Sequence, residues 1–179
     1  MTTYIALLRS VNVAGQGRMP MSEVTQSFVT LGYRDVRTYI QTGNVLFASP
    51  SKSETKLVEA IERRLDLDFG TSPAVLLRTA TELARVVATS PYLSQAAEPS
   101  RHHVTFLRTT PTAERLAAFT APPSGNDELT IIGREIYVHT PDGYANTKLN
   151  GAYLERHLGV VSTTRNWNSV AKLCQLAAE

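Results

Sequence analysis

The order of short apolar runs and amphipathic segments in residues 4–77 constrains the fold of this chain more than any other feature. Tyr4–Leu8 is a continuous apolar run that is typical of a buried strand, while residues 21–31 and 53–65 repeat apolar side chains at helical spacing. Three more strand-like runs complete the pattern: 36–40, 45–48 and 75–77. The resulting order, β-α-β-β-α-β, predicts the ferredoxin-like split unit in a first domain, residues 1–93.

The second half of the sequence repeats most of this order. The predicted elements are strands at 103–107, 129–132 and 135–139, and helices at 112–119, 149–159 and 167–177. Gly133-Arg134 separates the second and third of these strands as in a hairpin. Because residues 94–100 are small, polar and aperiodic, we place a linker there. The sequence thus predicts an α+β protein whose smaller second domain, 101–179, has the order β-α-β-β-α-α.

Composition excludes several classes of protein. The chain has 179 residues, of which 42% are hydrophobic, enough for a sizeable core without disulfide or metal staples. Its only cysteine, Cys174, excludes an intrachain disulfide, and no apolar run approaches the roughly 20 residues of a membrane-spanning helix. Residues 1–8 lack the basic leader of a signal peptide, so we expect a cytoplasmic protein with no membrane partner.

The net charge of +2 is too small to predict nucleic-acid binding by itself, but its distribution is uneven. Residues 1–50 and 147–179 each carry four bases and two acids, whereas residues 51–146 carry ten bases and twelve acids. Fourteen of the eighteen bases are arginines, the side chain suited to bidentate contacts with anions. Positive charge therefore gathers in two segments of the sequence that also hold the candidate binding residues.

A loop with two arginines follows the first predicted strand. Residues 9–20 include two glycines and lead into a helix, an arrangement that turns backbone N–H groups toward an anion. Arg9 and Arg18 would add charge-assisted bonds, and Asn12 would orient the ligand. The loop matches neither standard phosphate motif, and the alternative interpretation is a plain connection with exposed arginines.

A second donor-rich segment precedes the final predicted helix. We expect Thr163 or Thr164 to cap that helix and Trp167 to pack in the core. A helix N-terminus with hydroxyl and amide groups also suits an anion, so Arg165 and Asn166 are candidate ligands.

The predicted hairpin turn at Gln41–Asn44 is also rich in amide and hydroxyl groups. Gly43 and Asn44 fit a tight turn, which explains both residues without a binding role. We expect this turn at the end of the sheet opposite to the first loop. Gln41 and Asn44 are then not expected to act together with Arg9.

Three blocks of the sequence match the pattern of one known family. They are Tyr4–Arg9 with Asn12-Val13 and Met19–Met21; Val36–Val45; and Lys148-Leu149 with Leu158-Gly159 and Thr163–Asn168. Together they resemble the bacterial domain-of-unknown-function family sixteen ninety-seven over nearly the whole chain. The resemblance implies a two-part α+β fold with a ferredoxin-like first half, and it implies no activity.

We interpret the chain as a binding module for an anionic ligand, a nucleotide or a nucleic-acid phosphate, without a metal or another cofactor. The predicted ligand residues are Arg9, Asn12, Arg18, Arg165 and Asn166. One alternative is a small phosphate hydrolase of acylphosphatase-like topology, in which Arg18 would act with Asn12 or Asn44. A second is an RNA-binding sheet that stacks bases on Tyr4 and Phe47. A protein–protein adaptor is the third.

Overall fold

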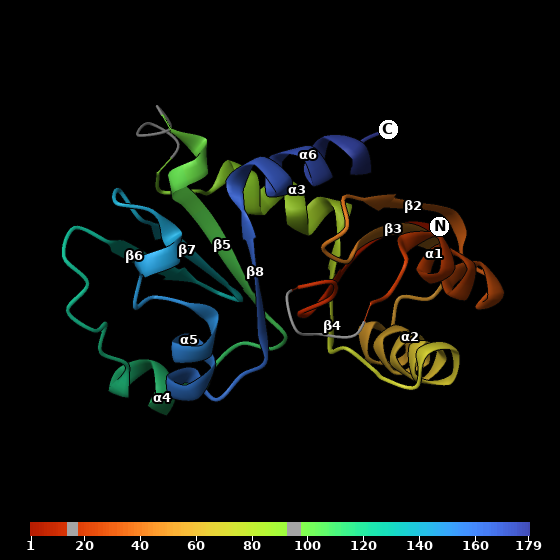
Figure 1. Ribbon diagram of the computed structural model, residues 1–179, viewed down its shortest axis with the longest axis horizontal. Helices are drawn as coiled ribbons and strands as arrows, with labels where there is room; N and C mark the ends of the chain where they lie inside the picture. Colours follow the sequence, from red (N-terminus) through yellow and green to blue (C-terminus); the bar gives the residue numbers. More distant parts are fainter. Residues whose placement is uncertain (14–17, 93–97) are drawn as a thin grey trace. The chain divides into compact units, whose positions relative to one another are not determined.

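The computed structural model describes residues 1–13, 18–92 and 98–179. Within them it contains six α-helices and two four-stranded antiparallel sheets, so the predicted α+β class is confirmed (Figure 1). The chain divides into two compact units: residues 1–84 with 173–179 form unit 1, and residues 85–172 form unit 2. No helix in the described part of the chain is long and apolar enough to cross a membrane.

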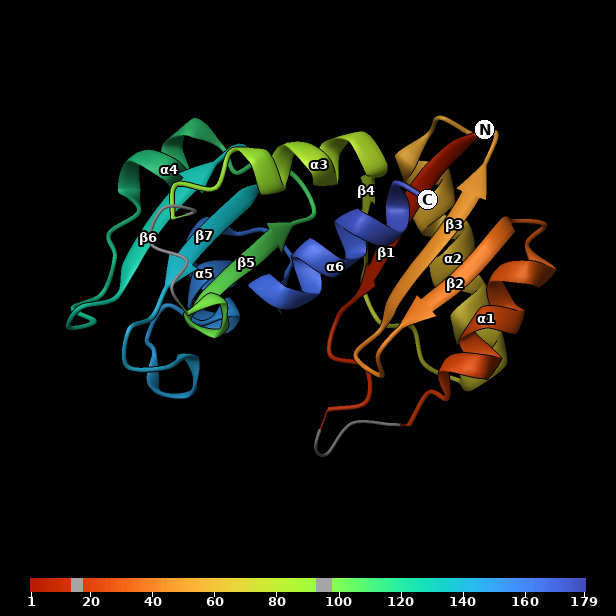
Figure 2. The same ribbon diagram turned by 90° about the horizontal axis from the view of Figure 1, so that it is seen from above.

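Unit 1 begins with the β-α-β-β-α-β order that the sequence predicts. Its elements are β1 (Thr2–Leu8), α1 (Met21–Thr30), β2 (Arg34–Tyr39), β3 (Asn44–Ser49), α2 (Glu54–Phe69) and β4 (Val75–Thr79). The strands lie in the order β2-β3-β1-β4, and each is antiparallel to its neighbours (Figure 2). Local signals set the ends of α2: the Ser53 hydroxyl accepts a hydrogen bond from the Lys56 N–H, and Gly70 ends the helix with a φ of 68°.

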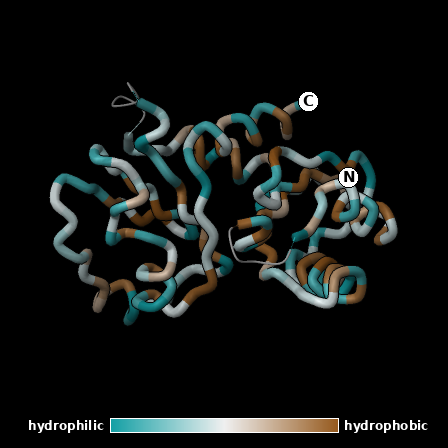
Figure 3. The backbone as a smooth tube through the Cα atoms, viewed as in Figure 1, coloured by the Kyte–Doolittle hydropathy of each residue, from teal (hydrophilic) through white to brown (hydrophobic). Residues whose placement is uncertain are grey.

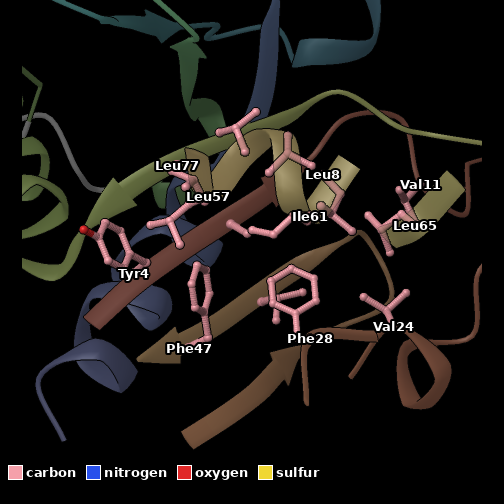
Figure 4. Close-up of a cluster of buried hydrophobic side chains, with 14 of the residues drawn as sticks. Tyr4, Leu8, Val11, Val24, Phe28, Phe47, Leu57, Ile61, Leu65 and Leu77 are labelled. Carbon is pink, nitrogen blue, oxygen red and sulfur yellow. The ribbon is translucent and has the colours of Figure 1, made fainter. Parts of the chain in front are cut away.

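The core of unit 1 lies between this sheet and the helices α1 and α2 (Figure 4). Tyr4, Ala6 and Leu8 of β1 belong to this core, while Ile5 and Leu7 alternate with them and are also fully buried. Because β1 is covered on both faces, its sequence is a continuous apolar run and not an alternating one. Along α2 the hydropathy alternates with the helical period (Figure 3), and the buried side chains are Leu57, Val58, Ile61 and Leu65.

Tyr4 and Phe47, the aromatic pair that an RNA-binding sheet would present, lie in this core (Figure 4). Their rings stack with centroids 5.5 Å apart, and Phe28 of α1 meets Phe47 edge-on at 5.3 Å. Tyr4 is 4% exposed and Phe47 is 1% exposed. Neither ring is presented for base stacking, so the RNA-binding alternative loses the side chains on which it depended.

Unit 2 has the same order of elements as unit 1. They are β5 (His102–Leu107), α4 (Ala113–Ala118), β6 (Glu128–Ile132), β7 (Glu135–His139), α5 (Gly151–Leu158) and β8 (Ser162–Asn166), with short 3-10 turns at Pro99–Arg101 and Tyr144–Asn146. The antiparallel strands lie in the order β6-β7-β5-β8, which corresponds strand for strand to the order in unit 1.

The strand β8 occupies the segment that the sequence predicted as the cap of the final helix. It pairs with β5 from Leu107↔Ser162 to His103↔Asn166. The strand was missed because the segment is polar and has no apolar run, although its β-branched threonines favour a strand. The final helix predicted over residues 167–177 does form, directly after this strand. The order of the second half is therefore β-α-β-β-α-β followed by the helix α6 (Trp167–Ala177).

The two units are connected through helices. The chain passes from unit 1 to unit 2 inside α3 (Ala80–Ala88) and returns inside α6, so residues 173–179 pack with unit 1. Arg37 of β2 holds this last segment, because its guanidinium donates to the Glu179 carboxylate at 2.9 Å and to the Leu176 carbonyl at 2.7 Å. The predicted linker, 94–100, lies mostly outside the described residues.

Candidate anion-binding site

Three loops of unit 1 meet at one end of its sheet: the loop after β1, the β2–β3 turn and the α2–β4 loop. The Leu8 N–H donates to the Gly43 carbonyl at 2.8 Å, and the Arg9 N–H donates to the Ala74 carbonyl at 2.9 Å. We expected the β2–β3 turn at the opposite end of the sheet, and that prediction was wrong. β1 and β2 are both antiparallel to β3, so they run in the same direction, and the turn after β2 lies beside the end of β1.

The turn approaches the end of β1 so closely that residue 43 is required to be a glycine. Gly43 has a φ of +81°, and a Cβ there would lie 2.8 Å from the Leu8 Cβ and 3.1 Å from the Val11 Cβ. The glycine therefore serves the contact between two loops as well as the turn itself.

Asn12 ties the first loop to this turn. Its Nδ2 donates to the carbonyls of Met19 at 2.8 Å and Gln41 at 2.9 Å, and its Oδ1 accepts from the Met19 N–H at 2.8 Å. Its φ of 55° lies in the left-handed region, which asparagine tolerates better than most residues. Both protons of the amide are engaged by backbone carbonyls, so Asn12 pins the ends of the loop and acts as a positioning residue.

A hollow of about 340 Å³ opens beside the end of β1. Its lining comes from the first loop and the α2–β4 loop: Arg9, Ser10, Val11, Met19, Thr71, Ser72, Pro73 and Ala74. The lining contains one guanidinium and three hydroxyl groups, and none of these eight described residues carries a carboxylate. A cation surrounded by hydroxyl donors is a favourable environment for an oxyanion.

The sequence located part of this lining and missed the rest. Arg9 was predicted as a ligand residue and lines the hollow; Arg18 is exposed and directly precedes Met19, another lining residue. The two glycines of the predicted loop lie outside the described residues. Thr71 and Ser72 were missed, because only the direction of the strands shows that the α2–β4 loop reaches this end of the sheet.

The other two predicted ligand residues belong to β8 in unit 2. Arg165 is 8% exposed, and its Nη1 donates to the Thr163 hydroxyl at 2.8 Å and to the Thr164 carbonyl at 3.0 Å. Burial lowers the pKa of this guanidinium to about 10. The Asn166 Oδ1 accepts from the Ser169 N–H at 2.9 Å, so Asn166 caps α6, and the prediction of a threonine cap was wrong.

Comparisons with known proteins agree with the fold. The profile of the family DUF1697, described as a protein of unknown function, matches residues 1–137. This chain belongs to DUF1697. The solved structure of the conserved bacterial protein SP0830 from Streptococcus pneumoniae is similar to this DUF1697 protein, with a TM-score of 0.77 and 20% sequence identity over 100% of this chain and 99% of that one. No functionally curated protein matches the chain.

The asparagines that an acylphosphatase-like reaction would need are engaged by the DUF1697 protein's own loops. Asn12 is held by Met19 and Gln41, as described above. Asn44 is fully buried, and its Nδ2 donates to the Tyr39 carbonyl and to the Thr42 hydroxyl, both at 3.1 Å. These contacts favour a structural role for both amides over the positioning of an attacking water.

Proposed function

We propose that this DUF1697 protein binds a phosphate-bearing anion, the phosphate of a nucleotide or of a nucleic acid, in the hollow beside Arg9. The observation that carries the proposal is the lining of the hollow, which combines one arginine with three hydroxyl side chains and no carboxylate. In the proposed complex the Arg9 guanidinium forms charge-assisted bonds to phosphate oxygens, and the Ser10 and Thr71 hydroxyls donate to the remaining ones. The Ser72 hydroxyl donates to the Glu62 carbonyl at 3.1 Å and would have to leave that partner to donate to the anion.

The rest of the loop supports the same proposal. Arg18 is exposed and adds a second positive charge to the loop that contributes Arg9. Asn12 holds the two described ends of the loop together through Met19 and so limits the conformational entropy that these ends lose when an anion binds. Arg165 and Asn166 have partners within their own strand and helix of unit 2, and the proposal does not require them.

The proposal is tested by titrating the protein calorimetrically with pyrophosphate, ATP and a short single-stranded RNA. At least one of these anions is expected to bind, and Arg9→Ala is expected to weaken its affinity about 10- to 100-fold, from the loss of charge-assisted hydrogen bonds. A steep decrease of affinity with added salt would identify a nucleic acid over a small anion. Binding by RNA alone and binding by ATP alone both agree with the proposal.

Arg34→Ala is the matched control for this experiment. Arg34 is exposed at the start of β2, the end of the sheet away from the three loops, and its loss is expected to change the affinity by less than about twofold. Failure of all three anions to bind, or equal weakening by Arg9→Ala and Arg34→Ala, would contradict the proposal and favour a protein–protein adaptor. A cytoplasmic location, which fits a chain with a single cysteine, belongs to the same proposal.

A further inference from the structure

The four edge strands of the two sheets differ in how they are protected from pairing with another chain. β4 and β8 are mostly buried strands. β2 is exposed, but its register shifts between Arg34 and Arg37, and Asp35 within the shift has a φ of +51°. A bulge with charged side chains is a standard protection of an exposed edge.

β6 lacks this protection. It lies at the edge of its sheet (Figure 2) and pairs with β7 in an unbroken register from Glu128↔His139 to Ile132↔Glu135. Its sequence, Glu-Leu-Thr-Ile-Ile, contains no proline and no lysine or arginine, and its single charge lies at its first residue. Ile132, at the other end of the strand, is a large apolar residue with 41% of its surface exposed.

The backbone of β6 offers hydrogen bonds to a further strand. The two-residue turn after Ile132 makes Ile132↔Glu135 a hydrogen-bonded pair, and such pairs alternate along an antiparallel ladder. Leu129 and Ile131 therefore direct their N–H and C=O groups away from β7. Among the described residues, neither has a hydrogen-bond partner on that side.

The strand is complementary to itself in one register. When two copies of β6 run antiparallel with Thr130 facing Thr130, Leu129 of each copy faces Ile131 of the other, and these two pairs use all four outward-facing backbone groups of each copy. Leu129 and Ile131 pack against the apolar core of unit 2 on one face, so their pairing extends a surface that is already apolar. This register places no like charges opposite one another.

We propose that the protein forms a two-fold dimer in which β6 pairs with β6 of a second copy, with Thr130 at the symmetry axis, so that the two sheets of unit 2 become one eight-stranded sheet. An isologous contact of this kind satisfies both edges at once and leaves none open for further addition. The inference is independent of the proposed anion site, which lies in unit 1.

Sedimentation velocity over a range of protein concentrations tests the dimer, and the wild-type chain is expected to show twice the mass of one chain. Thr130→Lys and Thr130→Glu each place two like charges directly opposite one another across the axis, on Cα atoms about 4.5 Å apart, so each variant alone is expected to sediment as a monomer. An equal mixture of the two variants is expected to regain the dimer mass, because Lys then faces Glu. The side chain of Thr130 has one described hydrogen bond, to the Tyr92 hydroxyl at 3.1 Å, and circular dichroism checks that each variant keeps its fold.

Thr38→Lys is the matched control, because it makes the same substitution on the bulged edge strand β2 and is expected to leave the dimer unchanged. A wild-type chain that stays monomeric up to its solubility limit overturns the proposal. A dimer that tolerates both Thr130 substitutions, or a mixture that stays monomeric while each variant is folded, overturns the pairing through Thr130.

Discussion

Unit 1 and unit 2 form the same pattern of backbone hydrogen bonds at the end of their first strand, which we call the frame. The side chains around the frame differ between the two units. In unit 1 the Leu8 N–H donates to the carbonyl of Gly43 in the hairpin turn, and in unit 2 the Leu107 N–H donates to the carbonyl of Arg134 in the corresponding turn, both at 2.8 Å. The residue whose carbonyl accepts this bond, which we call the corner of the frame, is thus a glycine in one unit and an arginine in the other.

The next residue of each strand continues the correspondence. The N–H of Arg9 donates to the Ala74 carbonyl and the N–H of Arg108 donates to the Val161 carbonyl, both at 2.9 Å. In unit 2 the Arg134 Nη1 also donates to the Arg108 carbonyl at 3.2 Å, whereas the loops of unit 1 form a hollow lined by hydroxyl groups. The frame therefore belongs to the fold, and any ligand chemistry belongs to the side chains that the loops add to it.

The largest expected effect comes from filling the corner of unit 1. Gly43→Ala places a methyl group 2.8 Å from the Leu8 Cβ at a φ that alanine disfavours. We expect the free energy of unfolding to fall by about 2–4 kcal/mol, because overpacking and backbone strain act together. Arg134→Ala at the corresponding corner removes the hydrogen bond to the Arg108 carbonyl without filling space or straining the backbone, and it is expected to cost about 1–1.5 kcal/mol. Urea unfolding followed by circular dichroism measures both, and equal losses would contradict the difference between the corners.

A smaller effect is expected from the side chain that holds the frame of unit 1. Asn12→Ala removes three hydrogen bonds to the backbone at a positive φ, and we expect a loss of about 1–3 kcal/mol in the free energy of unfolding. Asn12→Gly removes the same bonds but accepts the backbone conformation, so it is expected to be less destabilising by about 1 kcal/mol. If both variants are as stable as the wild type, Asn12 does not pin the loop.

The elements that could be predicted from the sequence are those with a signal of their own. The buried run of β1 and the helical spacing of α1 and α2 each indicate one structure, and together they give the order of unit 1. β8 has no such signal: its residues are polar, and its structure depends on pairing with β5, more than fifty positions earlier in the sequence. Local patterns favoured a helix cap there because α6 begins directly after it.

The candidate site was predictable only in part for a related reason. Arg9 and Asn12 were chosen from the composition of one loop, but the groups they meet, the carbonyls of Ala74 and Gln41, come from two other loops. The direction of each strand decides which loops share an end of the sheet, and the error about the hairpin turn was an error of direction. Thr71 and Ser72 belong to no motif, and they line the hollow because the α2–β4 loop returns to this end.

The smallest expected effect is a difference between the two units in how the free energy of unfolding changes at acid pH. His103 in β5 corresponds to Tyr4 in β1, as the pairing of each strand with its neighbour shows. His103 stacks on Tyr144 with ring centroids 4.1 Å apart, and burial, with a smaller contribution from the adjacent His102, lowers its pKa to about 4. Burial raises the pKa of Tyr4, so the corresponding position of unit 1 takes up no proton in weak acid.

The folded protein therefore keeps the His103 imidazole neutral down to about pH 4, while the unfolded chain binds a proton below pH 6.5. The stability is fully present above about pH 6.5 and falls as the pH decreases from there toward 4, because the unfolded state binds the extra proton. Since the ring is partly exposed, solvent screening limits the loss to on the order of 1 kcal/mol at about pH 4.5. His103→Phe is expected to remove this part of the pH dependence, and His157→Gln, at an exposed position of α5, is expected to keep it. The measurement is urea unfolding at pH 7 and at about pH 4.5, followed by the fluorescence of Trp167. Trp167 is the only tryptophan of the chain and belongs to unit 2, so its fluorescence reports on the unfolding of that unit. The same pH dependence in His103→Phe as in the wild type would assign the acid response to other groups.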